Sequence, residues 1–196
     1  MRRAIVTTLA IVGTLGMATT FSQSGASAPP NVAIDFLRTD ITKVADAPRS
    51  NENGGDRILK VIDMGPKYNL AVAVIRRAKT PKAAPDAIGG LNHVRLTEVY
   101  YITSGSGTMV TGGTVKDIRP MAADNFLVTN VVGPSNNATF IKPAQSRVVN
   151  EGDVIVIPAG VYHGFSEVPD HIEYVLIRPD VEKVLPAGYV NSVLKE

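Results

Sequence analysis

The sequence predicts an all-β domain, either a barrel or a sandwich, with little helix. Short runs rich in β-branched and aromatic residues recur along the chain, and turns that contain glycine separate them. Helical periodicity is confined to one short segment near the N-terminus. With 196 residues, the chain is long enough for one domain with a substantial core.

Residues 1–28 have the composition of an export signal. Arg2 and Arg3 precede an apolar, uncharged run, and small residues then favour cleavage after Ala26 or Ala28. The apolar run contains two glycines and falls short of the roughly 20 strongly apolar residues that span a bilayer. We therefore expect an exported protein, periplasmic or secreted, with no stable membrane anchor after cleavage.

The charge balance and the absence of cysteine exclude several classes of function. Loss of residues 1–28 removes two of the 20 basic residues and none of the 18 acidic ones, so the mature chain is close to neutral. No basic run with interleaved aromatics occurs, which excludes a nucleic-acid footprint. Without cysteine there are no disulfides, thiolate ligands or cysteine nucleophiles.

The first part of the mature chain is expected to form a short helix and a hairpin. Residues 32–45 carry four apolar side chains at helical spacing, which predicts one helix within an N-terminal segment, 29–57. A barrel domain, 58–178, then begins with two β-rich runs, 58–64 and 68–76, around a Gly-Pro pair that is typical of a hairpin turn.

The middle of the chain is harder to interpret. Residues 97–103 are strongly β-forming, and glycines at 105–107 and 112–113 predict two turns after them. Residues 115–145 contain prolines, glycines and only short apolar pieces, which predicts a long loop over one mouth of the barrel. Two buried strands, 154–157 and 172–177, and a C-terminal tail, 179–196, that packs on the outside are expected to complete the domain.

A histidine follows a rigid turn in the C-terminal half of the chain. Gly152 opens an apolar strand that ends at Pro158, and Gly160 precedes His163 by three residues. Proline restricts the backbone entering the turn, and glycine permits a tight conformation within it. This arrangement would present His163 to the barrel interior.

A second motif lies upstream, where His93 is followed by Glu98 and then by Gly105. Together, the two motifs resemble those of the cupin family, with Glu167 standing where the family has asparagine. The resemblance implies a double-stranded β-helix, or jelly-roll barrel, with a metal inside. The family uses two histidines in the first motif, and this chain has one. Either Leu91 or Arg95 replaces the other, and the count of four residues from His93 to Glu98 slightly favours Leu91.

The resemblance implies that His93, Glu98 and His163 are the metal ligands. Two imidazoles and one carboxylate match the ligand set of non-haem Fe(II) sites, and they also suit Zn²⁺, Mn²⁺ or Ni²⁺. Fe(II) is the favoured metal. The alternative is a degenerate member of the family that has lost its metal together with the histidine, and in which Arg95 binds a substrate carboxylate instead.

Other side chains have weaker claims to a functional role. Tyr100 shares a strand face with Glu98 and is a candidate catalytic acid or hydrogen-bond donor, although interior packing is the favoured role. Tyr162 and Phe165 flank His163 and would line the pocket or pack in the core. His171 is expected at the surface. No nucleophile-elbow motif supports a serine hydrolase.

Two functions remain open at this point. The first is a metal-dependent, dioxygenase-like enzyme that acts on a small oxygenated molecule. The second is a non-catalytic barrel that binds a small sugar-like or acid-like ligand. The expected partner in both cases is a small molecule rather than a nucleic acid, and a homodimer through edge strands is compatible with either function.

Overall fold

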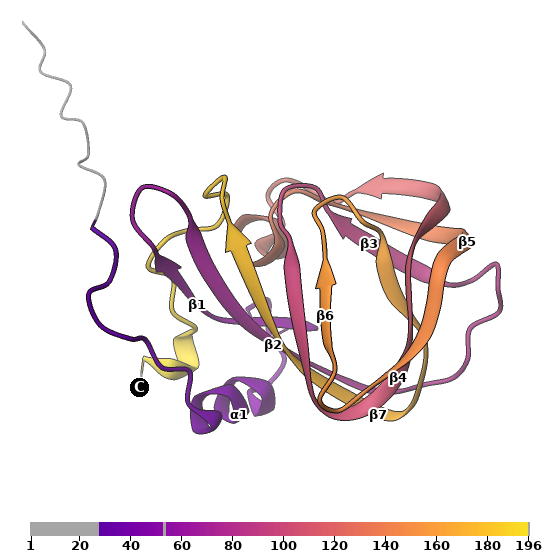
Figure 1. The fold of residues 1–196 in the computed structure, drawn as a ribbon, viewed down its shortest axis with the longest axis horizontal. Helices are drawn as coiled ribbons and strands as arrows, with labels where there is room; N and C mark the ends of the chain where they lie inside the picture. The colour runs from indigo at the N-terminus through magenta and orange to yellow at the C-terminus, as the bar shows by residue number, and fades with distance from the viewer. Residues whose placement is uncertain (1–27, 53, 196) are drawn as a thin grey trace, which may run out of the picture.

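The computed structural model describes residues 28–52 and 54–195 of the chain. The predicted export signal therefore lies outside the described residues, apart from Ala28. Figure 1 shows a barrel of antiparallel strands with a short helix at one end. The helices and strands are α1 (Arg38–Asp46), β1 (Asp56–Asp63), β2 (Asn69–Thr80), β3 (Gly89–His93), β4 (Glu98–Pro120), a π-helical turn (Val128–Val132), β5 (Ser135–Asn150), β6 (Val154–Ile157), β7 (His163–Asp180) and a 3₁₀ turn (Ser192–Leu194).

Two long strands connect the two sheets of the barrel. One sheet has the order β1-β2-β7-β4-β6, and the other joins β3 to β5 and β5 to β4. Both β4 and β7 belong to both sheets, because β7 also pairs with β3 through the Leu91–His163 bridge. The ring β7-β3-β5-β4 is thereby closed, as expected for a jelly-roll barrel.

The core lies between the two sheets and follows the period-two pattern of the strands. On β4, Tyr100 and Ile102 point inward, and on β7 Tyr174 and Leu176 do the same; all four are buried. Tyr100 stacks on Tyr174 with ring centroids 4.6 Å apart. Burial of large aromatic groups on adjacent strands stabilises this part of the barrel, which is also where the candidate site lies.

The N-terminal helix is shorter than predicted. It begins at Arg38, and residues 32–37 are not helical. Val44 and Ala45 cover Leu59 of β1 and Val74 of β2, and Ile41 and Phe36 pack against the same cluster. Most of a short helix's stability comes from such packing, and the other apolar residues before Arg38 (Val32, Ile34 and Leu37) are exposed, so the N-terminal part of the predicted helix has little to stabilise it.

The two glycine turns predicted after residue 103 are wrong. The chain continues as one bent strand, β4, through both glycine clusters. Gly105 has φ +75° and coincides with a shift in the β4–β7 register, so it bends the strand without reversing it. A Cβ at this position would lie 2.1 Å from the carbonyl oxygen of His171, so the close approach of β7 requires glycine here.

The long loop predicted at 115–145 is also wrong over most of its length. β4 runs on to Pro120 and β5 begins at Ser135, which leaves only residues 121–134 as a connection. The two strands form a ribbon whose side chains are largely solvent-exposed, Ile118 and Ile141 among them. Beyond the buried Ala138 and Phe140, exposure on both faces removes the alternation of apolar and polar residues by which strands are recognised in a sequence.

The other predicted elements are present, with some differences in burial. The first hairpin pairs β1 with β2, as expected. β6 has the predicted bounds but is only half-buried, since Val154 and Val156 face solvent. The C-terminal tail packs against β1 and α1 and also places Leu185 in the main core. None of the helices in the described part of the chain is long and apolar enough to cross a membrane.

Candidate metal centre

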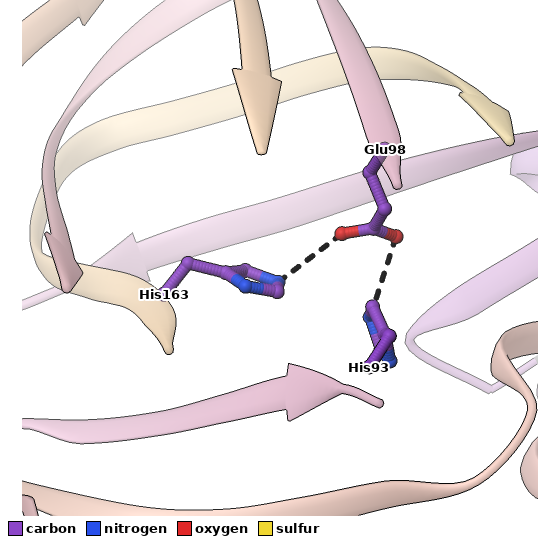
Figure 2. Close-up of side chains that lie close together, drawn as sticks. All are labelled: His93, Glu98 and His163. Carbon is purple, nitrogen blue, oxygen red and sulfur yellow. Dashed lines mark ion pairs between the residues drawn. The ribbon is translucent and has the colours of Figure 1, made fainter. Parts of the chain in front are cut away.

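Three buried side chains converge from three different strands. His93 ends β3, Glu98 begins β4 and His163 begins β7. Figure 2 shows both imidazoles directed at the Glu98 carboxylate, one on each side. All three side chains are at most 5% exposed. The structure thus brings together the three residues that the sequence motifs nominate.

The separations fit a shared ion. His93 Nε2 lies 3.3 Å from Glu98 Oε1, and His163 Nε2 lies 3.2 Å from Glu98 Oε2. One ligand atom from each residue can be chosen so that all three lie within 4.8 Å of one another. Two ligands that each lie about 2.0–2.2 Å from one metal stand roughly 3 Å apart when adjacent. The cluster needs little rearrangement to coordinate a metal.

The hydrogen bonds of His163 leave one of its nitrogens without a partner. Nδ1 lies 3.0 Å from the carbonyl oxygen of Val161, which can only accept, so Nδ1 carries the proton of the neutral ring. Nε2 is then a bare acceptor that faces a carboxylate oxygen, and it is buried without a hydrogen-bond partner. Two acceptors in contact in a buried site need a proton or a metal ion between them, and a metal ion would satisfy both lone pairs.

His93 is oriented by a serine on the adjacent strand β5. Its Nδ1 lies 2.8 Å from Ser135 Oγ, and that hydroxyl donates to the carbonyl oxygen of Gly133 at 2.9 Å. The serine therefore accepts from Nδ1–H, which turns the lone pair of His93 Nε2 toward Glu98. Burial lowers the pKa of His93, although Glu98 partly opposes this shift. The neutral ring is the form that binds metals.

A buried arginine neutralises the carboxylate. Arg178 on β7 is fully buried, donates from Nε to Glu98 Oε1 at 2.8 Å, and forms a second ion pair with Asp56 of β1. Burial opposes ionisation of Glu98, but the positive charge of Arg178 outweighs it and holds the pKa of Glu98 well below the usual range. Glu98 is therefore an ionised ligand, and it has one cationic partner before any metal binds.

Acidification is expected to destabilise the metal-free protein. The folded-state pKa of His93 lies below its unfolded value of about 6.5, so the folded state binds fewer protons and loses stability as the pH falls below about 6.5. Glu98 adds a further loss below about pH 4.5, since its folded-state pKa is also lowered. Urea unfolding at a series of pH values between 7 and 3 would measure both losses, and a flat profile would contradict the assignment.

Tyr100 is tied to the same carboxylate. Its hydroxyl donates to Glu98 Oε2 at 3.0 Å, and its ring meets the His163 ring edge-on. Burial raises the pKa of Tyr100 well above the ordinary value, and the negative charge of Glu98 raises it further. Tyr100 is therefore a protonated donor whose hydrogen bond fixes the position of the Glu98 side chain.

A cavity of about 190 Å³ adjoins the cluster. His93, Tyr100 and His163 line it together with Leu91. Leu91 pairs directly with His163 across the strands, whereas Arg95 is half-exposed and binds Glu182 at 3.2 Å. The structure thus places Leu91, not Arg95, where the missing histidine would stand, and the alternative that Arg95 replaces a ligand is wrong.

The remaining nominated side chains divide between the cavity and the surface. Phe165 lines the cavity and packs on Tyr174, while Tyr162 is not part of its lining. His171 is at the surface, as predicted, with its side chain 46% exposed.

Sequence reasoning missed several residues of the site, of which Arg178 has the largest effect. One signal for it was available: Arg178 continues the inward-facing series of Tyr174 and Leu176, and a charge on the buried face of a strand demands a buried partner. Ser135 had no such signal, because its contact with His93 depends on the pairing of β3 with β5.

Fold and site together define a small jelly-roll barrel with a buried His-Glu-His cluster beside an internal cavity. A family model described as Cupin matches residues 82–185, more than half of the chain. The chain belongs to the cupin family. Its double-stranded β-helix and the positions of both motifs agree with this assignment.

Several solved structures resemble the chain at low sequence identity. The crystal structure of BH2720 from Bacillus halodurans is 14% identical, with 86% of this chain and 98% of that chain covered and a TM-score of 0.44. DMSP lyase DddQ from Ruegeria pomeroyi is 14% identical, with 62% of this chain and 42% of that chain covered and a TM-score of 0.35. An 11S globulin from Wrightia tinctoria is 14% identical, with 71% of this chain and 28% of that chain covered and a TM-score of 0.39. No curated protein matches the sequence.

Proposed function

We propose that this protein is an exported cupin that binds a divalent metal ion through His93, Glu98 and His163 and acts on a small oxygenated molecule. The observation that carries the proposal is the bare Nε2 of His163, buried against an ionised carboxylate. Two imidazoles and one carboxylate leave open positions on most divalent metals. Fe(II) is the favoured ion, which makes a dioxygenase-like reaction the leading candidate.

The chain's own residues have separate roles in this proposal. A bound metal would supply Lewis acidity and, as Fe(II), access to oxygen chemistry. Ser135 and the carbonyl of Val161 orient the two imidazoles, and Tyr100 and Arg178 hold Glu98. The apolar part of the cavity wall excludes water from the reacting molecule.

Metal titration of the chelator-treated protein tests this proposal. Fe(II), Zn²⁺, Mn²⁺ and Ni²⁺ are added separately, and the thermal unfolding midpoint is measured along with the bound metal. A free metal concentration of 100 times Kd should stabilise the fold by about 2.7 kcal/mol. One equivalent of bound metal with a raised midpoint supports the proposal. No binding of any of the four ions would refute it.

Replacing Ser135 with alanine should weaken metal binding about 10- to 100-fold, because His93 loses the partner that fixes its tautomer and orientation. Competition with a chromogenic chelator would measure the change. Ser166→Ala is the matched control, since Ser166 is also buried but its hydroxyl donates to the Thr108 carbonyl, away from the cluster. Equal affinities in the two variants would contradict the role of Ser135.

One observation favours a second candidate, a non-catalytic binding barrel. Arg178 already neutralises Glu98, and it places two donors on Oε1, the oxygen that faces His93. A metal must therefore share this carboxylate with a fixed cation, which weakens the electrostatic attraction. A barrel that binds a small molecule without metal would show ligand binding that chelators leave unchanged.

A further inference from the structure

Arg77 stands at the mouth of the cavity with unused hydrogen-bond donors. It follows Ile75 on the same face of β2 and is itself solvent-exposed, and both residues line the cavity that contains His93 and His163. Its Nε donates to Tyr174 Oη at 3.0 Å, and its guanidinium lies 5.6 Å from the centroid of the Phe165 ring. No ion pair or further hydrogen bond involves Arg77 in the described part of the chain.

An outer cavity of about 440 Å³ leads to the same arginine. It shares Arg77, Leu91 and Phe165 with the inner cavity, so Arg77 lies where the two meet. Arg119 of β4 is a second cation on its wall, and no acidic side chain of the described residues lines it. A path that carries two arginines and no carboxylate attracts anions toward the inner cavity.

The charge of the inner cavity also favours an anion. Among the described residues, Asp56 is the only carboxylate that lines the inner cavity, and it is already paired with Arg178. Arg77 is the cation without a carboxylate partner. A divalent metal on the His-Glu-His cluster would add further positive charge to the same space. Asp56 and Glu98 share Arg178, so together with Arg77 these four groups carry no net charge, and a bound metal would leave excess positive charge for an anion to balance.

The size and walls of the inner cavity limit the ligand further. About 190 Å³ corresponds to about six water molecules at about 30 Å³ each. Aliphatic side chains form much of the wall, including Ile75, Leu91 and Val132. A guanidinium presents parallel donors that match a planar carboxylate. These features suit a short hydrocarbon chain that ends in a carboxylate.

We propose that the site binds a short-chain organic acid, with its carboxylate on Arg77 and an oxygen substituent at the metal end. This inference rests on the proposed function for the role of the metal, but its Arg77 contact can be tested separately. The probes are 3-hydroxybutyrate and its neutral amide, 3-hydroxybutyramide, which have the same size and differ in charge.

Calorimetric titration of Zn²⁺-loaded protein should show that the acid binds and that the amide binds much more weakly. Arg77→Gln should weaken binding of the acid about 10- to 100-fold and leave the amide unaffected. Arg77→Lys should give an intermediate affinity, because lysine retains the positive charge but lacks the two parallel donors of the guanidinium. This variant also replaces Arg77→Gln in the test if the glutamine variant folds poorly. Arg147→Gln removes a partly exposed arginine that bonds Gln145 away from both cavities, and this variant should bind the acid like the wild type.

The outcomes separate this inference from the proposed function. Equal binding of acid and amide, or equal binding of the acid by the wild type and Arg77→Gln, overturns the inference even if one metal ion is bound. Titration of the metal-free protein with the acid tests the Arg77 contact independently of the metal. If no metal binds but the acid still depends on Arg77, the inference stands and the metal proposal fails.

Discussion

Replacing Arg178 with methionine is expected to lower the free energy of unfolding by about 3–5 kcal/mol. Arg178 is fully buried and is the cationic partner of both Glu98 and Asp56. Methionine fills a similar volume, so the main loss is electrostatic: the buried Glu98 and the partly buried Asp56 remain without their counterion. Urea denaturation at neutral pH, monitored by circular dichroism, would measure the change.

Metal should offset part of this loss. Zn²⁺ would replace the missing positive charge next to Glu98, so it should stabilise Arg178→Met more than it stabilises the wild type. Arg76→Met is the matched control, since Arg76 lies on β2 and makes two ion pairs, with Asp46 and Glu173, on the exposed side. Such surface pairs contribute about 0–1 kcal/mol. A loss of the same size in both variants would contradict the special role of the buried arginine.

Replacing His163 with alanine is expected to abolish stoichiometric metal binding, with a loss of affinity greater than the 10- to 100-fold typical of residues that only support a ligand. His163 contributes the nitrogen that the structure leaves unpaired, and Leu91 beside it has no atom that could ligate a metal in its place. Metal analysis of protein purified without a histidine tag, followed by chelator competition, would measure the effect.

His171→Ala provides the comparison. His171 is an exposed histidine of the same strand, hydrogen-bonded to Ser104 and Asp170. The His171→Ala variant should retain the wild-type metal content. One equivalent of metal in the His163→Ala variant would show that the ion is held elsewhere, and it would remove the basis of the proposed function.

Local patterns in the sequence were sufficient to locate the short apolar strands. The first hairpin and the inward series Glu98, Tyr100 and Ile102 are present as expected, and β6 has the expected bounds but is half-buried rather than buried. The β4–β5 ribbon was mistaken for a loop because both of its faces meet solvent and its glycines resemble turn signals. In β4 these glycines bend a continuous strand, and only the neighbouring strand β7 shows why Gly105 is needed.

The three central residues of the site could be nominated from the sequence because each lies in a short motif with its own spacing. The supporting residues could not be found in this way. Ser135 reaches His93 through the β3–β5 pairing, and Asp56 reaches Glu98 only through Arg178. The choice between Leu91 and Arg95 likewise depended on which side chain faces the cavity.

The sequence by itself determined the fold class, the two motifs and the ligand types, because turn chemistry and strand periodicity act over a few residues. Only the tertiary structure decided the charge state of the centre and the character of its cavity. Those properties depend on Arg178 and Arg77, which lie 80 and 21 positions away from Glu98 in the chain. Buried electrostatics depend on distance in space, and the closure of the barrel sets that distance.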